Sequence, residues 1–441
     1  MRRVEPVARL AGHLAVPGDK SISHRSVLLG ALCDGETHVT GFGRSADSEA
    51  TIGVVRALGV EVYEHGDDTL RVFGRGLRGL RPAAGPLDCA NSGTLMRLVT
   101  GILAGQEGRF ELTGDSSLSS RPMERVASPL RQMGARIETT DGHAPIRIDG
   151  GPLEPIAYRL PVASAQVKSA ILLAGLFARG GETTVVEPAP TRDHTERMLQ
   201  AAGARVERRE ESVSVWPAER LHLGPVEIPG DFSSAAPFVV AATLVPGSEL
   251  HLHGVNLNPR RAGLLAILER MGARITVYNR REIGGEPGGD LEVRSAELVA
   301  TRVGPGEVPL AIDELPLFAL AASCARGDSV LRGAEELRTK ETDRIEATVD
   351  ALRAIGQHAR ATVDGFRIRG VPTRPRGGSV EARGDHRIAM LGAVAGVASG
   401  DGVTVDDPDC VAVSFPGFFD LLAQLEETSR RTDSWGREDV L

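Results

Sequence analysis

The sequence predicts an α/β protein of two pseudo-symmetric domains, each built from three similar units. Two short phrases that recur along the chain lead to this prediction. One phrase is the end of a helix that passes through a glycine into a strand. The other is an apolar helix followed by a Gly-rich turn and a strand of alternating character. Six units of this kind need neighbours to cover their faces, which favours two groups of three.

The helix–glycine–strand phrase first occurs as ALGVEV, residues 57–62. It returns as QMGARI, AAGARV, RMGARI and, more weakly, AIGQHA. Glycine is favoured immediately after a helix because it adopts the left-handed backbone conformation without a steric penalty. We therefore expect helices to end just before Gly59, Gly134, Gly203, Gly272 and Gly356.

The apolar helices have bodies such as LLGAL, AILLAGLFA and AMLGAVAGVA, with hardly a polar residue on any face. A helix that is apolar all round is buried, so these helices are predicted to form the cores of the domains. A strand is expected after each of them. The helices are expected to begin near Ser21, Ser92, Ala165, Phe232, Glu314 and His386.

The boundary between the domains is predicted within IPGD, residues 228–231, which opens the fourth unit. The segment before Pro17 is too short to fold alone, so we expect it to add a strand to the C-terminal domain. The N-terminal domain is then residues 20–228, and the C-terminal domain is residues 1–19 together with 229–441. Residues 279–290 are predicted to form an exposed hairpin loop, and the polar residues 426–441 a frayed end.

The composition is that of a globular protein without a polyanionic partner. A formal net charge of −8 and an aromatic content of 4% argue against nucleic acid and anionic membranes. No apolar run is long enough to span a bilayer, and the first residues lack the apolar core of a signal peptide. The four cysteines show no metal-binding spacing. We therefore expect a cytoplasmic protein without disulfides or structural zinc.

The stretch PGDKSISHR, residues 17–25, opens the first apolar helix and predicts a phosphate site. A helix N-terminus presents free N–H groups and a partial positive charge, which suit an anion. Asp19 or Ser21 is the expected N-cap, and Lys20 and Arg25 add two cations. An ordinary capped surface helix is the alternative interpretation of this stretch alone.

Polar phrases precede the other apolar helices too, and we expect the six helix N-termini to face one cleft between the domains. Helix capping alone explains Ser92, Ser164 and Asp231. Cations are unfavourable at a helix N-terminus without an anion, so capping does not explain the others. These are Lys20, Arg25, Gln166, Lys168 and Arg387.

Lysine is rare in this chain: of the 51 basic residues, only Lys20, Lys168 and Lys340 are lysines. Each is therefore a candidate for a task that arginine cannot perform. The phrase ELRTKETDRI, residues 336–345, places Lys340 and Arg344 four residues apart, on one face of a helix. Taken alone, this phrase favours a charge ladder on a solvated helix.

Nine phrases in order make the chain similar to the 3-phosphoshikimate 1-carboxyvinyltransferase family, also called the EPSP synthases. They are PGDKSISHR, NSGTLMR, SSRPM, SAQVKSA, TRDHTE, PGDFSSAA, DELP, ELRTKETDRI and DHRIAM. The resemblance implies domains of three βαβαββ units with buried helices, an inside-out α/β barrel, and an active site in the interdomain cleft. It implies transfer of the enolpyruvyl group of phosphoenolpyruvate to the 5-hydroxyl of shikimate 3-phosphate, in aromatic amino acid biosynthesis. No metal or organic cofactor is implied.

The resemblance also assigns roles to residues. Asp313 and Glu341 are the acid–base candidates, and Lys20 completes the catalytic set. Shikimate 3-phosphate would be held by Ser21, Arg25, Ser164, Ala165, Gln166, Arg192, Asp313 and Lys340. Phosphoenolpyruvate would be held by Lys20, Gly93, Arg121, Gln166, Arg344 and Arg387, and Asn91 completes the substrate-binding set.

Two alternatives stay open at this point. The sister enzyme that transfers enolpyruvate to UDP-N-acetylglucosamine has the same fold, but its typical members carry a Cys where this chain has SSLSSR, residues 116–121. A binding protein with a degenerate site is the other alternative, and the complete set of candidate residues argues against it. In this family the herbicide glyphosate occupies the phosphoenolpyruvate site, and Gly93 implies a sensitive enzyme. A monomer is expected.

Overall fold

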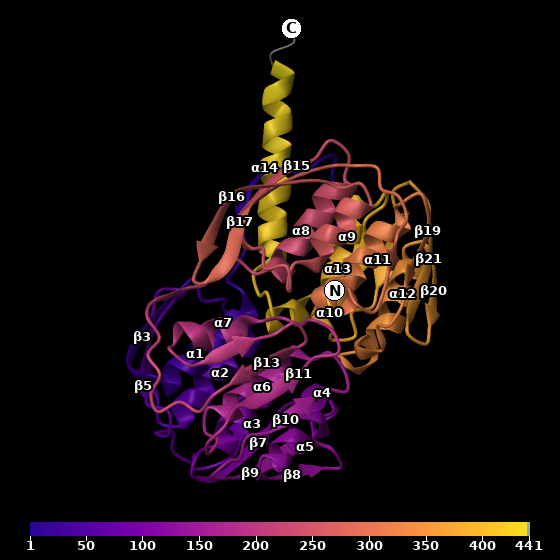
Figure 1. Ribbon diagram of the computed structural model, residues 1–441. Helices are drawn as coiled ribbons and strands as arrows, with labels where there is room; N and C mark the ends of the chain where they lie inside the picture. Colours follow the sequence, from indigo (N-terminus) through magenta and orange to yellow (C-terminus); the bar gives the residue numbers. More distant parts are fainter. Residues whose placement is uncertain (439–441) are drawn as a thin grey trace. The chain divides into compact units, whose positions relative to one another are not determined.

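The computed structural model describes residues 1–438, which divide into two compact units (Figure 1). The N-terminal unit comprises Gly18–Pro229 together with the short segment Ile283–Glu286. The C-terminal unit comprises Met1–Pro17, Gly230–Glu282 and the described residues from Pro287 onward. Helices alternate with small mixed sheets in both units, so the predicted α/β class is confirmed.

The N-terminal unit repeats one arrangement of helices and strands. Its helices are α1 (Lys20–Leu32), α2 (Ala46–Ala57), α3 (Gly93–Ala104), α4 (Ser116–Ser119), α5 (Glu124–Gln132), α6 (Ala165–Gly175) and α7 (His194–Ala201). Its strands are β3 (Asp34–Thr40), β4 (Glu61–His65), β5 (Thr69–Arg75), β6 (Leu87–Asp88), β7 (Gly108–Thr113), β8 (Arg136–Thr140), β9 (His143–Gly150), β10 (Ala157–Arg159), β11 (Thr183–Val186), β12 (Val206–Arg208), β13 (Ser212–Val215) and β14 (Val226–Glu227). They form sheets of order β14-β3-β5-β4, β6-β7-β9-β8 and β10-β11-β13-β12.

The C-terminal unit follows the same plan. Its helices are α8 (Phe232–Leu244), α9 (Gly263–Arg270), α10 (Val308–Ala311), α11 (Leu315–Ser323), α12 (Arg344–Ala354), α13 (His386–Ala398) and α14 (Phe418–Glu438), with 3-10 turns η1 (Glu335–Thr339) and η2 (Pro408–Val413). Its strands are β1 (Arg2–Val4), β2 (Ala11–Ala15), β15 (Glu249–Asn256), β16 (Arg274–Ile283), β17 (Glu286–Arg294), β18 (Arg302–Val303), β19 (Gly327–Leu331), β20 (His358–Thr362), β21 (Gly365–Gly370), β22 (Gly378–Val380) and β23 (Val403–Val405). The sheet orders are β16-β17-β15-β2, β18-β19-β21-β20 and β1-β23-β22.

The sheets share a pairing pattern that explains the sequence repeat. Each strand that follows an apolar helix pairs in parallel with one neighbour and antiparallel with the other, as in β6–β7 and β7–β9. The corresponding pairs in the C-terminal unit are β18–β19 and β19–β21. The repeated phrases therefore encode one supersecondary unit used again and again.

The six apolar helices begin within two residues of the expected positions, and each unit has its own hydrophobic core. Every residue of α13 is buried, as an all-round apolar helix requires. The glycines of the helix–glycine–strand phrase have φ values between +84° and +95°, which confirms their predicted role at helix ends.

The expected strand before Pro17 is present as β2, which pairs in parallel with β15 of the C-terminal unit. The preceding β1 also joins this unit, through antiparallel pairing with β23. The segment thus contributes two strands, because both of its short extended runs meet an open sheet edge.

Two expectations about irregular segments were wrong in part: residues 279–290 do form a hairpin with exposed positions, but most of the segment is regular strand. Residues 279–290 belong to the long hairpin β16–β17, where only Gly284 and Gly285 form the turn and residues 288–290 are buried. Two of the four glycines that suggested a loop, Gly288 and Gly289, lie inside strand β17. The polar segment that begins at Glu426 continues helix α14 as far as Glu438, and residues 439–441 lie outside the described part.

Among the helices of the described residues, none combines the length and the apolar character that a membrane span requires.

Candidate active site

In the N-terminal unit, hydrogen bonds join the N-terminal halves of α1 and α6 and the N-cap of α3. His24 of α1 has its Nε2 atom 3.4 Å from the hydroxyl of Ser92, the N-cap of α3. Arg25 of α1 donates from Nη2 to the hydroxyl of Ser169 on α6 across 3.0 Å. Three helix N-termini therefore lie at one end of this unit, where their dipoles favour an anion.

Lys20 is the first residue of α1, and Asp19 is the N-cap, since its carboxylate accepts the Ile22 N–H at 3.1 Å. The Lys20 ammonium lies 2.7 Å from the Asp47 carboxylate of α2. The Asp47 carboxylate therefore compensates the charge of Lys20 at the start of α1, and no bound anion is required for this. The sequence argument was incomplete here, because the chain itself supplies the carboxylate.

Arg25 is almost completely buried, with 4% exposure. Its Nε donates to the hydroxyl of Thr195 at 2.6 Å and its Nη1 to the carbonyl of Ser21 at 2.8 Å. Burial lowers the pKa of Arg25 to about 10, with Glu196 opposing the shift and Arg192 adding to it. The side chain therefore stays cationic at neutral pH, and it shares its surroundings with a second guanidinium.

Gly93, the first residue of α3, lies beside two guanidinium groups. A Cβ atom at this position would be 2.8 Å from Nη1 of Arg97 and 3.3 Å from Nη1 of Arg121. Arg121 is oriented by a 2.8 Å hydrogen bond to the side-chain oxygen of Asn91. Because Gly93 has no side chain, the backbone N–H groups at the start of α3 and the two guanidinium groups border the same space.

The start of α6 is held in place by its own side chains. Ser164 is the N-cap and accepts the Val167 N–H at 3.4 Å. Gln166 accepts from Nη1 of Arg97 at 2.5 Å and donates to the Thr94 hydroxyl at 2.9 Å. Ala165 is the first helical residue, and its small side chain leaves this helix end open. The amide of Gln166 is therefore fixed in orientation between α3 and α6.

Lys168 has a different place from the other two lysines. Its side chain is fully buried, and its ammonium lies 3.0 Å from Glu187 and 2.8 Å from Glu196. Arg208 reaches the same two carboxylates. Lys168 is thus a compact charge within the core of the N-terminal unit, which agrees with a task unsuited to arginine but not with a place among ligands.

In the C-terminal unit, the first turns of α8, α11 and α13 are likewise connected. Arg261 lies 2.7 Å from Asp231, the N-cap of α8, and 3.1 Å from Glu314, the N-cap of α11. Arg387 of α13 donates from Nη1 to the backbone carbonyl of Ser233 on α8 at 3.3 Å. Three helix N-termini therefore meet at one end of this unit as well.

Arg344 is the centre of the charged network in the C-terminal unit. Its guanidinium lies 2.8 Å from Asp385, 2.5 Å from Glu341 and 3.4 Å from Asp313. Burial alone would lower the pKa of Arg344, but these carboxylates raise it above its ordinary value. Lys340 approaches the same Asp313 carboxylate at 3.8 Å. Two cations and both acid–base candidates thus form one cluster.

The predicted helical face shared by Lys340 and Arg344 is wrong. Lys340 follows the 3-10 turn η1 as its C-cap, and α12 begins only at Arg344. The helix starts there because the Asp343 carboxylate caps it, accepting from the N–H groups of Ile345 and Glu346. The two cations meet through Asp313 and not through helical spacing.

Three side chains that orient the candidate residues were not selected from the sequence. Arg97 stands within the phrase NSGTLMR, so its motif could have indicated it. Asp47 and Arg261 lie in stretches without a distinctive pattern, and only the fold brings them to Lys20 and to Asp231.

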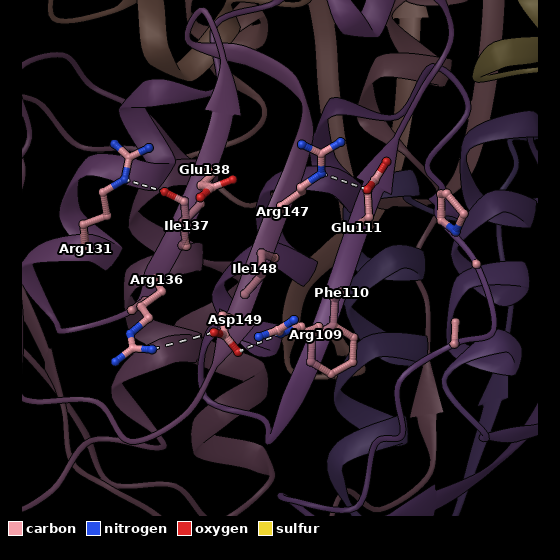
Figure 2. A pocket seen from close by; sticks show the side chains of 14 residues that line it. Arg109, Phe110, Glu111, Arg131, Arg136, Ile137, Glu138, Arg147, Ile148 and Asp149 are labelled. Atoms are coloured by element: carbon pink, nitrogen blue, oxygen red, sulfur yellow. Dashed lines mark hydrogen bonds and ion pairs between the residues drawn. The ribbon is translucent and has the colours of Figure 1, made fainter.

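A hollow of about 940 Å³ on the outer face of the β6-β7-β9-β8 sheet contains none of the candidate residues (Figure 2). Its exposed side chains are engaged across the strands: Arg147 with Glu111 at 3.0 Å, and Arg109 and Arg136 each 3.9 Å from Asp149. This arrangement is typical of a solvated sheet face, where such pairs contribute little energy.

Comparison with solved structures shows that the fold is that of the enolpyruvyl transferases, and comparison with known sequences identifies the family. A sequence model described as EPSP synthase (3-phosphoshikimate 1-carboxyvinyltransferase) matches residues 4–422. The chain belongs to this family.

Several relatives match over nearly their full length. The 3-phosphoshikimate 1-carboxyvinyltransferase of Methylococcus capsulatus is 51% identical, over 95% of this chain and 96% of the relative. That of Salinibacter ruber is 50% identical, over 96% and 99%. The solved EPSP synthase of Acinetobacter baumannii has a TM-score of 0.85 at 44% identity and covers 96% of this chain and 97% of its own. The enolpyruvyl transferase NikO of Streptomyces tendae, at 19% identity and a TM-score of 0.76, shares the fold.

The chain is therefore an enolpyruvyl-transferring enzyme of the shikimate pathway. The alternative of transfer to UDP-N-acetylglucosamine is not favoured, since these relatives are EPSP synthases.

Proposed function

We propose that the residues at the helix N-termini of the two units act on the same pair of substrates, shikimate 3-phosphate and phosphoenolpyruvate. The single observation that carries this proposal is the repeated arrangement of three joined helix N-termini with cationic side chains in each unit. Both substrates are anions, and arginine pairs with carboxylate and phosphate through two parallel hydrogen bonds.

In this proposal Arg25 and Arg192 are the cations for the phosphate of shikimate 3-phosphate, because they lie close together and Arg25 cannot lose its proton near neutral pH. Lys340 and Asp313 contact the ring hydroxyls. The remaining contacts come from Ser21, Ser164, Ala165 and Gln166. Phosphoenolpyruvate is held by Lys20, Gly93, Arg121, Gln166, Arg344 and Arg387, with Asn91 orienting Arg121.

The reaction joins the 5-hydroxyl oxygen to C2 of phosphoenolpyruvate while the hydroxyl loses its proton and C3 gains one. The tetrahedral intermediate then returns a proton from C3, and the bond from C2 to the phosphate oxygen breaks. Asp313 accepts the hydroxyl proton and Glu341 serves C3. Both carboxylates contact Arg344, so a single guanidinium fixes the distance between the groups that exchange protons with the substrates.

An assay of phosphate release with each acceptor in turn tests the proposal. We expect release with shikimate 3-phosphate and none with UDP-N-acetylglucosamine. Glu341→Gln should lower kcat strongly while KM for either substrate changes little, because it removes proton transfer and not binding. Asp313→Asn should lower kcat strongly and also raise KM for shikimate 3-phosphate, because Asp313 contacts the ring hydroxyls as well. Unchanged kcat in both variants would overturn the assignment of the two carboxylates.

We also propose that the enzyme acts as a monomer in the cytoplasm. The four cysteines are free thiols, which suits a reducing compartment. Sedimentation at enzyme concentrations near those of the assay tests the monomer. A dimer under these conditions would contradict it.

A further inference from the structure

Three histidines lie together on the outer face of the sheet β16-β17-β15-β2 in the C-terminal unit. His13 is on β2, and His251 and His253 are on the adjacent β15, where His251 is the register partner of His13. The ring centroid of His13 is 4.6 Å from that of His251 and 5.2 Å from that of His253. All three remain partly or largely exposed to solvent. The proposed catalytic function does not use them.

The closest approach within this histidine cluster joins Nδ1 of His13 to Nε2 of His253 across 3.0 Å. We propose that these two nitrogens, with His251 beside them, bind a divalent transition-metal ion, Ni²⁺ or Cu²⁺. The two nitrogens are hydrogen-bonded to each other when no ion is bound. A metal–imidazole bond is about 2.1 Å long, so the two nitrogens at this separation would subtend an angle of about 90° at a bound ion. That angle suits octahedral or square-planar coordination better than the tetrahedral geometry of zinc.

The second ring nitrogen of His253 faces a carboxylate, as in many metal sites. Nδ1 of His253 lies 3.4 Å from Oδ2 of Asp290. The Asp290 carboxylate is itself fixed, since it accepts from the backbone N–H of Gly254 at 2.8 Å and from the amide of Asn279 at 3.0 Å. With its Nδ1–H directed at Asp290, His253 presents an unprotonated Nε2 to the ion. His13 binds after its ring proton moves from Nδ1 to Nε2, which leaves the imidazole neutral.

Backbone geometry brings His253 and Asp290 together. Strand β15 departs from regular pairing with β17 between Leu252 and Val255, and Gly254 within this bulge has φ +64°. A bulge re-aims the neighbouring side chains and exposes an N–H group. Here the exposed group is the N–H of Gly254 that orients Asp290.

The charges around the histidine cluster favour a cation. Besides Asp290, the cluster is bordered by Glu249, 3.9 Å from Nε2 of His251, and by Glu292, the register partner of His251 on β17. Arg281 and Arg294 pair with these carboxylates and offset only part of their charge. The remaining negative charge attracts a divalent ion.

Among the described residues, Asp193, His194 and Glu286 form the group of three whose ligand-type atoms all lie within 4.8 Å of one another, a criterion that the histidine cluster does not meet. The Nε atom of Arg197 lies 3.2 Å from Asp193 and 3.7 Å from Glu286. Arg197 therefore already pairs with both carboxylates, and His194 lies 2.7 Å from Glu286, so these ligand atoms are engaged with one another and we do not assign a metal to them.

Calorimetric titration of the full chain, without an affinity tag and freed of metal with a chelator, tests the proposal. We expect one Ni²⁺ to bind per chain at pH 7.5, and His13→Ala and His253→Ala each to weaken binding at least tenfold. The matched control is His358→Ala, which removes an exposed histidine from strand β20 of the same unit and should leave binding unchanged. All three positions are on the protein surface, so circular dichroism should show folded variants.

Anomalous scattering from crystals soaked in Ni²⁺ provides the location, and a peak between His13 and His253 is expected. Absence of Ni²⁺ and Cu²⁺ binding to the wild-type chain would overturn the proposal. So would equal affinity in the wild type and His13→Ala, or an anomalous peak at other residues only.

Discussion

The ammonium of Lys20 and the carboxylate of Asp47 form an ion pair with a distance of 2.7 Å between Nζ and Oδ2. The side chains are 19% and 7% exposed, so the pair is partly enclosed. A planar guanidinium is larger than an ammonium and spreads its charge over three nitrogens. We expect Lys20→Arg to keep the fold but to lower kcat on the order of 100-fold, as loss of an aligned charge does. Steady-state kinetics beside thermal unfolding provide the measurement.

The matched control for this substitution is Arg56→Lys. Arg56 pairs with Glu64 at 2.7 Å on an exposed part of the same unit, and we expect wild-type kinetics from this variant. Wild-type turnover in Lys20→Arg would show that a compact ammonium is not needed at the start of α1.

Gly93 provides the second prediction, which concerns inhibition. A methyl group at this position would meet Arg97 at 2.8 Å and Arg121 at 3.3 Å, so both guanidiniums must shift. We expect the wild type to be inhibited by glyphosate competitively with phosphoenolpyruvate. In Gly93→Ala the inhibition constant should rise several tens-fold, about 2 kcal/mol, and more than KM for phosphoenolpyruvate, because the inhibitor is the longer molecule.

Gly53 in α2 is the control, because an added Cβ there has no neighbour within 4 Å. Gly53→Ala should leave both constants unchanged and stabilise the helix slightly. Equal glyphosate sensitivity of the wild type and Gly93→Ala would exclude Gly93 from the inhibitor's surroundings.

The third prediction concerns stability. Removing the Lys168 ammonium leaves Glu187 and Glu196 buried with less compensation. We expect Lys168→Met to lower the free energy of unfolding by about 3–5 kcal/mol, as measured for broken buried ion pairs. Urea denaturation followed by circular dichroism measures the change. Arg220→Ala, which breaks the exposed pair with Asp34, should cost at most about 1 kcal/mol.

A small effect of Lys168→Met would mean that Arg208 alone compensates the two carboxylates. Adding Glu196→Gln distinguishes the cases. If the buried charge causes the loss, the double variant should recover part of the stability that Lys168→Met loses.

Most of the fold could be predicted because its signals are local. A glycine after a helix, such as Gly134 with φ +95°, and an all-round apolar helix such as α13 each follow from a few neighbouring residues. Because the same phrases recur along the chain, each weak signal is supported by the others. The hairpin β16–β17 was misjudged because its glycines, including Gly289, suit a tight approach inside a strand as well as they suit a loop.

The candidate site was predictable only where helix capping and motif phrases mark it. Asp343 shows where this prediction fails. It caps the helix one residue before Arg344, so Lys340 lies outside the helix that the four-residue spacing of Lys340 and Arg344 had suggested. The partners that orient the charged side chains, such as Asp47 for Lys20 and Arg261 for Asp231, come from other elements of the fold. Such long-range partners leave no periodic signal in the sequence.

The fourth prediction concerns thiol chemistry. Burial raises the pKa of Cys33 and Cys324 to about 11 each and that of Cys410 to about 12, and it raises the pKa of Cys89 as well. The thiolate is the reactive form, so all four should react slowly at pH 7. We expect N-ethylmaleimide to leave activity intact over an hour under native conditions and to label four thiols after unfolding. Rapid inactivation would indicate a reactive cysteine, as in the sister enzymes.

The last prediction concerns His24, which lies between α1 and α3 with Nδ1 2.5 Å from the hydroxyl of Thr51. Burial, together with the charges of Lys20 and Arg25, lowers the pKa of His24 well below its usual value. Below about pH 6.5 the His24 side chain takes up a proton in the unfolded chain. In the folded state it stays neutral in this pH range. Because the unfolded state then binds more protons, stability falls as the pH falls from about 6.5, and this contribution disappears above it.

The limiting slope from one such proton is about 1.4 kcal/mol per pH unit. Urea unfolding of the wild type and of His24→Gln at pH 5.5, 6.5 and 7.5 separates this slope from that of other groups. Glutamine does not titrate, so the variant should lose less stability between pH 6.5 and 5.5 than the wild type, whatever its stability at pH 7.5. Identical losses in the two proteins over this interval would mean that His24 accepts its proton in the folded state, and that its burial does not exclude the charge.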